Sequence, residues 1–161
     1  MGLDMYLYLR KYESCGQWDK DFQKKKKDFY PVELKELGET ITRNNSMSKQ
    51  TEYKVAYWRK ANQVHNYFVQ KCANGENDCK PVYVELGDLK ELVSLCKEVI
   101  EDPKKAEAKL PTTSGFFFGS SKYDEYYKQD LEYTVEQLEP IIKFLESEEG
   151  KDYEAIYEAS W

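Results

Sequence analysis

The chain has 161 residues, of which 40% are hydrophobic, 15% aromatic and 34% charged, and its formal net charge is −6 at pH 7. This length suits one domain, and a domain of this size buries roughly 70% of its unfolded surface, so it needs no disulfide or structural metal. The sequence contains no signal peptide and no apolar run near 18 residues. We therefore expect a cytoplasmic protein without a membrane partner.

Charge and cysteine usage exclude two further classes of site. Residues 123–161 hold 12 acidic and 3 basic side chains, a net charge of −9, which leaves 18 acidic and 21 basic side chains, a net charge of +3, for residues 1–122. The acidic end argues against direct nucleic-acid binding and permits attraction to a basic partner. The four cysteines (Cys15, Cys72, Cys79 and Cys96) lack CxxC spacing, and the chain has one histidine, so no zinc site is predicted. Pairing of Cys72 with Cys79 is left open.

The N-terminal third begins with a strand. Alternating apolar residues predict a half-buried strand over 3–12, with Leu3, Met5, Leu7 and Leu9 on one face. Residues 13–30 have no clean period and include four consecutive lysines, so a mobile loop is expected there. A short helix is predicted at 31–38 and a turn-rich connection at 43–49.

The middle of the chain predicts two helices separated by a short strand. The segment 51–58 starts as a strand and runs into a helix to about residue 72, because Tyr57, Ala61, Val64, Phe68 and Cys72 follow steps of three and four. A short strand follows at 81–86. A second helix, capped by Asp88, ends near residue 102 and has an apolar face made of Leu89, Leu92, Val93, Cys96, Val99 and Ile100.

The C-terminal part predicts a long helix and a last strand. Ser121 is the expected N-cap, Gly150 the expected end, and Pro140 an expected kink or restart. The predicted inward stripe is Tyr127, Leu131, Val135, Leu138, Ile142 and Leu145. Residues 152–161 alternate and are expected to pair with the first strand. The fold class is therefore α+β, a single domain over residues 1–161 with a small, mostly antiparallel sheet packed by about three main helices.

The stretch "LPTTSGFFFGSSKYDEYY" (110–127) is the strongest candidate for a binding loop. Gly115 and Gly119 permit unusual backbone conformations, and hydroxyls come from Thr112, Thr113, Ser114, Ser120 and Ser121. The loop leads into a helix N-terminus, which favours an anion, although the GxxxxGK[ST] motif is absent. Strand-like alternation would put Phe116 and Phe118 on one side and Phe117 on the other. These rings either plug the core or contact a ligand or partner.

A second candidate is a polar row on the first long helix. Arg59, Asn62 and Asn66 are spaced by three and four, so a helix would place them on one face. Arginine can bind a carboxylate or phosphate, and asparagine can both donate and accept hydrogen bonds. His65 lies beside this row, either as a histidine satisfied at the core edge or as a catalytic group.

Several stretches together resemble a family of small uncharacterised proteins encoded by bacteriophages and prophages. They are "MGLDMYLYLRKY", "YWRKANQVHNYF", "NGENDC", "ELVSLCKEVIEDP" and "LPTTSGFFFGSSKYDEYY", and the resemblance is weakest at 13–50. It implies a setting, a bacterial cytoplasm under phage control, and no specific activity. In such a setting small proteins often block host defences by binding a defence protein or sequestering its nucleotide signal.

Three functions follow as hypotheses. The leading one is a non-enzymatic phage protein that counters host defence by holding a small phosphorylated, nucleotide-like ligand. The residues expected around it are Arg59, Asn62, His65, Asn66, Ser114, Gly115, Phe117, Gly119, Ser120, Ser121 and Tyr123. The second is an inhibitor that contacts a host defence protein through the acidic, tyrosine-rich C-terminal region. The third is a hydrolase or transferase using His65. No cofactor, metal site or catalytic set is predicted, and homo-oligomerisation is left open.

Overall fold

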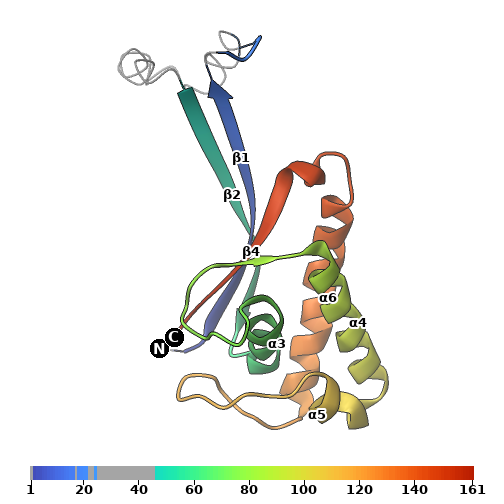
Figure 1. Ribbon diagram of the computed structural model, residues 1–161. Helices are drawn as coiled ribbons and strands as arrows, with labels where there is room; N and C mark the ends of the chain where they lie inside the picture. Colours follow the sequence, from blue (N-terminus) through green and yellow to red (C-terminus); the bar gives the residue numbers. More distant parts are fainter. Residues whose placement is uncertain (1, 17, 22–23, 25–45) are drawn as a thin grey trace. The chain divides into compact units, whose positions relative to one another are not determined.

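The computed structural model describes residues 2–16, 18–21, 24 and 46–161. The chain divides into two units, residues 1–10 with 53–161 and residues 11–52. The first unit contains all the helices named below and much of the sheet (Figure 1). In the second unit, β1 continues to a turn in which the Gly16 amide donates to Asp19 Oδ2 at 2.8 Å and the Asp19 amide donates to the Gly16 carbonyl at 3.0 Å.

Four strands form one antiparallel sheet in the order β2-β1-β4-β3. They are β1 (Asp4–Gly16), β2 (Ser46–Arg59), β3 (Val82–Val84) and β4 (Tyr153–Ser160). In the β3–β4 pair, Val82 lies opposite Tyr157 and Val84 opposite Ala155. The predicted pairing of the first and last strands is confirmed, because β4 lies next to β1.

Three main helices pack on this sheet and confirm the predicted α+β class. They are α3 (Asn62–Cys72), α4 (Leu86–Glu101) and α6 (Glu125–Leu145). The 3₁₀ turn η2 (Pro103–Lys105) and the short α5 (Ala106–Lys109) lie between α4 and α6, and the 3₁₀ turn η3 (Gly150–Asp152) lies between α6 and β4. Helices α4 and α6 lie along each other (Figure 1). All six predicted apolar residues of α4 contact the core, with Ile100 partly buried.

The core is apolar apart from a few paired polar groups. The alternation of β1 buries Met5, Leu7 and Leu9, as predicted, and the α6 stripe buries Tyr127, Leu131, Thr134, Leu138 and Ile141. The sequence pattern missed Ile141 and Thr134, and the predicted Val135, Ile142 and Leu145 are only partly buried. Thr134 is fully buried. Its hydroxyl accepts from Trp58 Nε1 at 3.0 Å and donates to the Asp130 carbonyl at 2.6 Å. Both polar groups are therefore satisfied inside the core.

The predicted helix to about residue 72 is confirmed at its end, Cys72, but its predicted start at Tyr57 is wrong. Strand β2 runs to Arg59 and α3 begins only at Asn62, because Lys60 adopts a left-handed backbone conformation with φ of 60°. The Lys60 amide donates to the Leu3 carbonyl at 2.8 Å, which ties the end of β2 to the start of the chain. The spacing of three and four from Tyr57 therefore runs through the end of a strand and a tight turn before the helix begins. Arg59 consequently does not share a helical face with the two asparagines.

Other predicted boundaries also move. Strand β1 continues beyond residue 12 to Gly16, and the expected connection at 43–49 is strand from Ser46 onward. The predicted helix at 31–38 and half of the expected loop at 13–30 lie outside the described residues.

Two predicted helix ends are wrong. Helix α4 starts at Leu86, so Asp88 is its third residue rather than its cap. Helix α6 ends at Leu145, and Gly150 instead sits where a Cβ atom would lie 1.9 Å from the Phe144 carbonyl oxygen. The helix is continuous through Pro140, and no restart occurs there.

Candidate functional site

The loop between α5 and α6 is fixed to α3 by one buried side chain. Asn62 is 1% exposed, and its Nδ2 donates to the carbonyls of Phe118 at 3.0 Å and Ser120 at 2.8 Å. Its Oδ1 accepts from the Thr113 amide at 3.0 Å. Both amide hydrogens of Asn62 and its carbonyl oxygen are thus used on the loop backbone. The predicted convergence of Asn62 with the loop is observed, and its contacts are structural.

Further hydrogen bonds hold both ends of the loop. Asn66 Nδ2 donates to the Pro111 carbonyl at 3.2 Å, and the Leu3 amide donates to the Phe117 carbonyl at 3.0 Å. Thr112 joins the two sides, because its amide donates to Tyr123 Oη at 3.3 Å and its hydroxyl to the Ser121 carbonyl at 3.1 Å. These contacts come from the start of the chain, from α3 and from the residues preceding α6. The loop conformation is therefore determined by the surrounding fold.

The three phenylalanines have different surroundings. Phe118 is 6% exposed and meets the rings of His65 and Trp161 edge-on, with centroids 5.2 Å and 5.4 Å away. Phe117 packs partly against the core, whereas Phe116 is 95% exposed and contacts the edge of Phe117 at 4.8 Å. One ring is buried and one is exposed, as predicted. The expected alternation is wrong, because a turn, with the Phe118 amide donating to the Gly115 carbonyl at 3.1 Å, separates Phe116 from Phe118.

Both glycines are required by this geometry. A Cβ atom on Gly115 would lie 2.7 Å from Cγ of Phe118, so a side chain there would displace the anchoring ring. Gly119 has a φ of +85°, and its Cβ would lie 3.1 Å from Cβ of Lys60. The two glycines let Phe118 turn inward immediately after Phe116 has pointed outward.

His65 is buried next to the loop, and both of its ring nitrogens have hydrogen-bond partners. It is 1% exposed, with Nε2 at 2.9 Å from Asn77 Oδ1 and Nδ1 at 2.6 Å from Tyr157 Oη. Because an amide oxygen can only accept, Nε2 donates its hydrogen to Asn77 and Nδ1 accepts from Tyr157. Burial lowers the pKa of His65, and the hydrogen bond to Asn77 opposes this shift. The histidine is therefore neutral, with both ring nitrogens engaged.

The cavity beside His65 is too small for a substrate. Its volume is about 20 Å³, and its lining includes His65, Asn77, Cys79, Tyr157 and Trp161. This is room for about one water molecule. Cys79 is exposed, Cys72 is half-buried, and no disulfide joins the two.

The start of α6 already carries its own anion. Asp124, and not the predicted Ser121, is the N-cap, and its Oδ1 accepts from the amides of Tyr126 at 3.1 Å and Tyr127 at 3.2 Å. Glu125 adds a second carboxylate in the first turn. The helix dipole and the free amides are therefore compensated by the chain itself, and a phosphate would meet two negative charges.

The remaining predicted site residues are dispersed around the loop. Arg59 is exposed at the end of β2, and its guanidinium would lie 3.8 Å from a Cβ atom on Gly2. Ser114, Ser120 and Ser121 are exposed on the loop, and the Ser120 hydroxyl accepts from the Lys122 amide at 3.1 Å. Sequence reasoning missed the contact of Leu3 with the loop and those of Asn77, Tyr157 and Trp161 with His65. The contacts of these four residues join parts of the chain that no local pattern connects.

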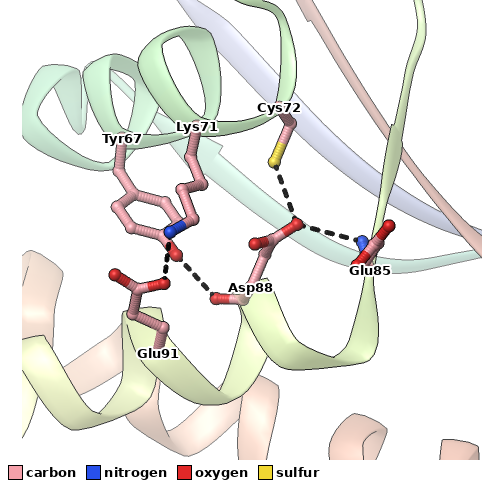
Figure 2. A network of polar contacts seen from close by, with 6 residues as sticks. All are labelled: Tyr67, Lys71, Cys72, Glu85, Asp88 and Glu91. Atoms are coloured by element: carbon pink, nitrogen blue, oxygen red, sulfur yellow. Dashed lines mark hydrogen bonds and ion pairs between the residues drawn. The ribbon is translucent and has the colours of Figure 1, made fainter.

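A second polar network joins α3 to α4 (Figure 2). Tyr67 Oη donates to the Asp88 carbonyl at 2.8 Å, and Lys71 pairs with Glu91 at 2.7 Å. Asp88 Oδ2 also accepts from the Glu85 amide at 3.3 Å and lies 3.8 Å from Cys72 Sγ. Burial, together with the Asp88 charge, raises the pKa of Cys72 to about 12, so its thiol is protonated and unreactive at neutral pH. This network fixes the two helices together.

No family model, curated protein or solved structure matches the chain. The resemblance to small phage and prophage proteins stays a prediction. Within the described ranges, no three histidine, cysteine or carboxylate side chains are grouped to hold a metal ion. No helix in that part of the chain combines the length and apolar character needed to span a bilayer.

Proposed function

We propose that the protein is a non-enzymatic binding protein that contacts a partner protein through Phe116. The observation that carries this proposal is a phenylalanine 95% exposed at the tip of a loop held in one conformation by Asn62. An exposed apolar ring on an ordered loop loses little conformational entropy on binding. Burying its surface would contribute about 2 to 3 kcal/mol, which is within the range of an interface hot spot.

The aromatic cluster of Tyr6 and Tyr57 on the sheet already has partners within the sheet. Tyr6 and Tyr57 are in contact with centroids 5.4 Å apart, and Tyr57 Oη donates to Asp4 at 2.5 Å. Lys54 Nζ lies 4.4 Å from the centre of the Tyr6 ring. These tyrosines already have ring, charge and hydrogen-bond partners. Phe116, by contrast, has a ring contact only at the edge of Phe117 among the described residues.

The charge of the C-terminal region favours a basic partner. Helix α6 exposes Tyr126 at 75% and Tyr133 at 39%, interspersed with the exposed acids Glu125, Glu132, Glu136 and Glu139. Tyrosine is enriched at interfaces, and complementary charge accelerates encounter. We therefore retain the acidic, tyrosine-rich region as the second part of the proposed contact.

The two alternative functions receive less support from the geometry. A phosphorylated ligand near Asn62 would have to displace the loop backbone, and at the start of α6 it would meet Asp124 and Glu125. A reaction using His65 would require breaking its bond to Asn77 or to Tyr157. The resemblance to phage proteins implies a bacterial host cell, so we propose that the partner is a host defence protein.

The test is affinity capture from bacterial lysate with three forms of the full chain: wild type, Phe116→Ala and Tyr83→Ala. Tyr83 is a matched control because it is 65% exposed on β3 and is also an aromatic residue. A protein captured by wild type is then purified and titrated by calorimetry. We expect Phe116→Ala to weaken its binding at least about 30-fold and Tyr83→Ala to leave it unchanged. Equal binding by all three forms would contradict the proposal, and co-purification of a nucleotide would favour the alternative.

A further inference from the structure

A second feature, independent of Phe116, is a cavity of about 260 Å³ between the C-terminal end of α4, α5 and the first turns of α6. Its floor is apolar and buried, and is made of Val99, Ala106, Tyr127 and Leu131. Ile100 and Pro103 form one side of its wall. This volume accommodates an aliphatic chain of several carbon atoms, and a polar or charged group could not be solvated at its base.

The mouth of the cavity is acidic and aromatic. Asp124 and Glu125 line it together with Tyr123 and Lys128. The one cation in this lining, Lys128 Nζ, lies 3.4 Å from Glu132 on the following turn. The lining therefore holds two carboxylates beside one cation that is already paired, although Oδ1 of Asp124 also caps α6, and the Tyr123 ring, 44% exposed, offers a face for a cation.

We infer that this cavity binds an aliphatic chain that ends in a cation, with the chain on the apolar floor and the charge at Asp124 and Glu125. Two kinds of guest carry an aliphatic chain with a terminal ammonium group: a free alkylammonium compound and a lysine side chain of another protein. An anionic guest of the same length would be repelled by the two carboxylates. A neutral guest would gain only the burial of its chain. The inference holds whether or not Phe116 binds a partner.

The experiment is an NMR titration of the full-length ¹⁵N-labelled protein with hexylammonium, hexan-1-ol and hexanoate at pH 7. Hexylammonium is expected to bind with a dissociation constant on the order of 1 mM, in line with a ligand of this size. The shifts should include the amides of Ala106 and Tyr127, which line the floor. The alcohol should bind more weakly, and the carboxylate should not bind measurably.

Charge-removing variants locate the cation. Asp124→Asn keeps a good helix cap, and together with Glu125→Gln it should weaken hexylammonium binding about ten-fold or more. Glu136→Gln removes the same charge from an exposed residue about 16 Å further along the helix and should have no effect. Binding that does not depend on Asp124 and Glu125, or that is as tight for the alcohol or the carboxylate, would overturn the inference.

A last arm separates the two sources of the cation. Nα-acetyl-lysine N-methylamide presents the same ammonium on a chain attached to a peptide backbone. Tighter binding of this compound than of hexylammonium would identify a protein side chain as the natural guest. Tighter binding of hexylammonium would identify a small amphiphilic amine. Failure of both compounds to shift the floor amides would overturn the site altogether, and the pull-down with Phe116→Ala would be unaffected by that result.

Discussion

Replacing Asn62 with alanine should release the loop that presents Phe116. Asn62 is buried and makes three hydrogen bonds, to Phe118, Ser120 and Thr113, at 2.8 to 3.0 Å. A neutral hydrogen bond contributes about 1 kcal/mol, so the three together contribute about 3 kcal/mol. The Phe118 carbonyl would also lose a partner in a buried environment, which places the effect toward the upper side of this value.

Two assays measure this change. Urea unfolding of Asn62→Ala should show a midpoint lowered by about 1 to 1.5 M, given the slope expected for a domain of this size. Hydrogen exchange should accelerate at the Thr113 amide, which loses its acceptor. If the loop detaches before the rest unfolds, the exchange effect will be large and the shift in midpoint small.

Asn66→Ala provides the matched control for Asn62→Ala. Its hydrogen bond to the Pro111 carbonyl is exposed and 3.2 Å long, so its loss should change the free energy of unfolding by less than about 0.5 kcal/mol. The reasoning is refuted if Asn62→Ala changes stability by less than about 1 kcal/mol and leaves exchange in the loop unaltered.

Three further predictions concern the same region. Gly115→Ala should destabilise the protein by about 1 to 3 kcal/mol in urea unfolding, because the new methyl group would lie 2.7 Å from the Phe118 ring. A change in stability of less than about 0.5 kcal/mol would contradict this packing. The free energy of unfolding should fall as the pH drops below about 6.5, because burial lowers the pKa of His65 in the folded state and the unfolded chain alone takes up the proton. His65 is the chain's single histidine, so His65→Gln should make stability less dependent on pH between 5.5 and 7. An equal slope of stability against pH in both proteins would contradict this prediction. Replacing Glu132, Glu136 and Glu139 with lysine should weaken binding of the captured partner and reduce the salt dependence of its affinity between 50 and 300 mM NaCl. The ion pairs of Glu132 and Glu139 are exposed, so the free energy of unfolding should change by no more than about 1 kcal/mol. Unchanged affinity would show that the acidic region does not contact the partner.

The elements that could be predicted from the sequence are those specified by local pattern. The alternation of Leu3, Met5, Leu7 and Leu9 and the apolar face of α4 both contact the core as expected. Pairing of the last strand with the first was also predictable, because each has one apolar face that must be covered.

The errors arise where long-range contacts override local spacing. Strand β2 extends to Arg59, and the Lys60 amide bonds to Leu3, which is 57 residues earlier in the sequence, a contact that no helical periodicity can reveal. The partner of His65, Tyr157, is 92 residues away in the sequence.

The sequence singles out the loop and Asn62 as a ligand site, whereas the structure gives these residues a structural role. Asn62, Gly115 and Gly119 were expected to surround a phosphorylated ligand because their residue types suit one. In the structure the same residues shape and hold the loop itself. Residue type indicated that this region is unusual, whereas only the contacts show that its polar groups face the chain's own backbone.

The central claim, that the fixed loop presents Phe116 to another protein, is tested most directly by a photo-crosslinking amino acid in its place. The full chain carrying p-benzoylphenylalanine at position 116 would be irradiated in bacterial lysate beside a chain carrying it at position 83. We predict a discrete crosslinked protein from position 116 and none of that mass from position 83. Crosslinking to the same proteins from both positions, or from neither, would contradict the account.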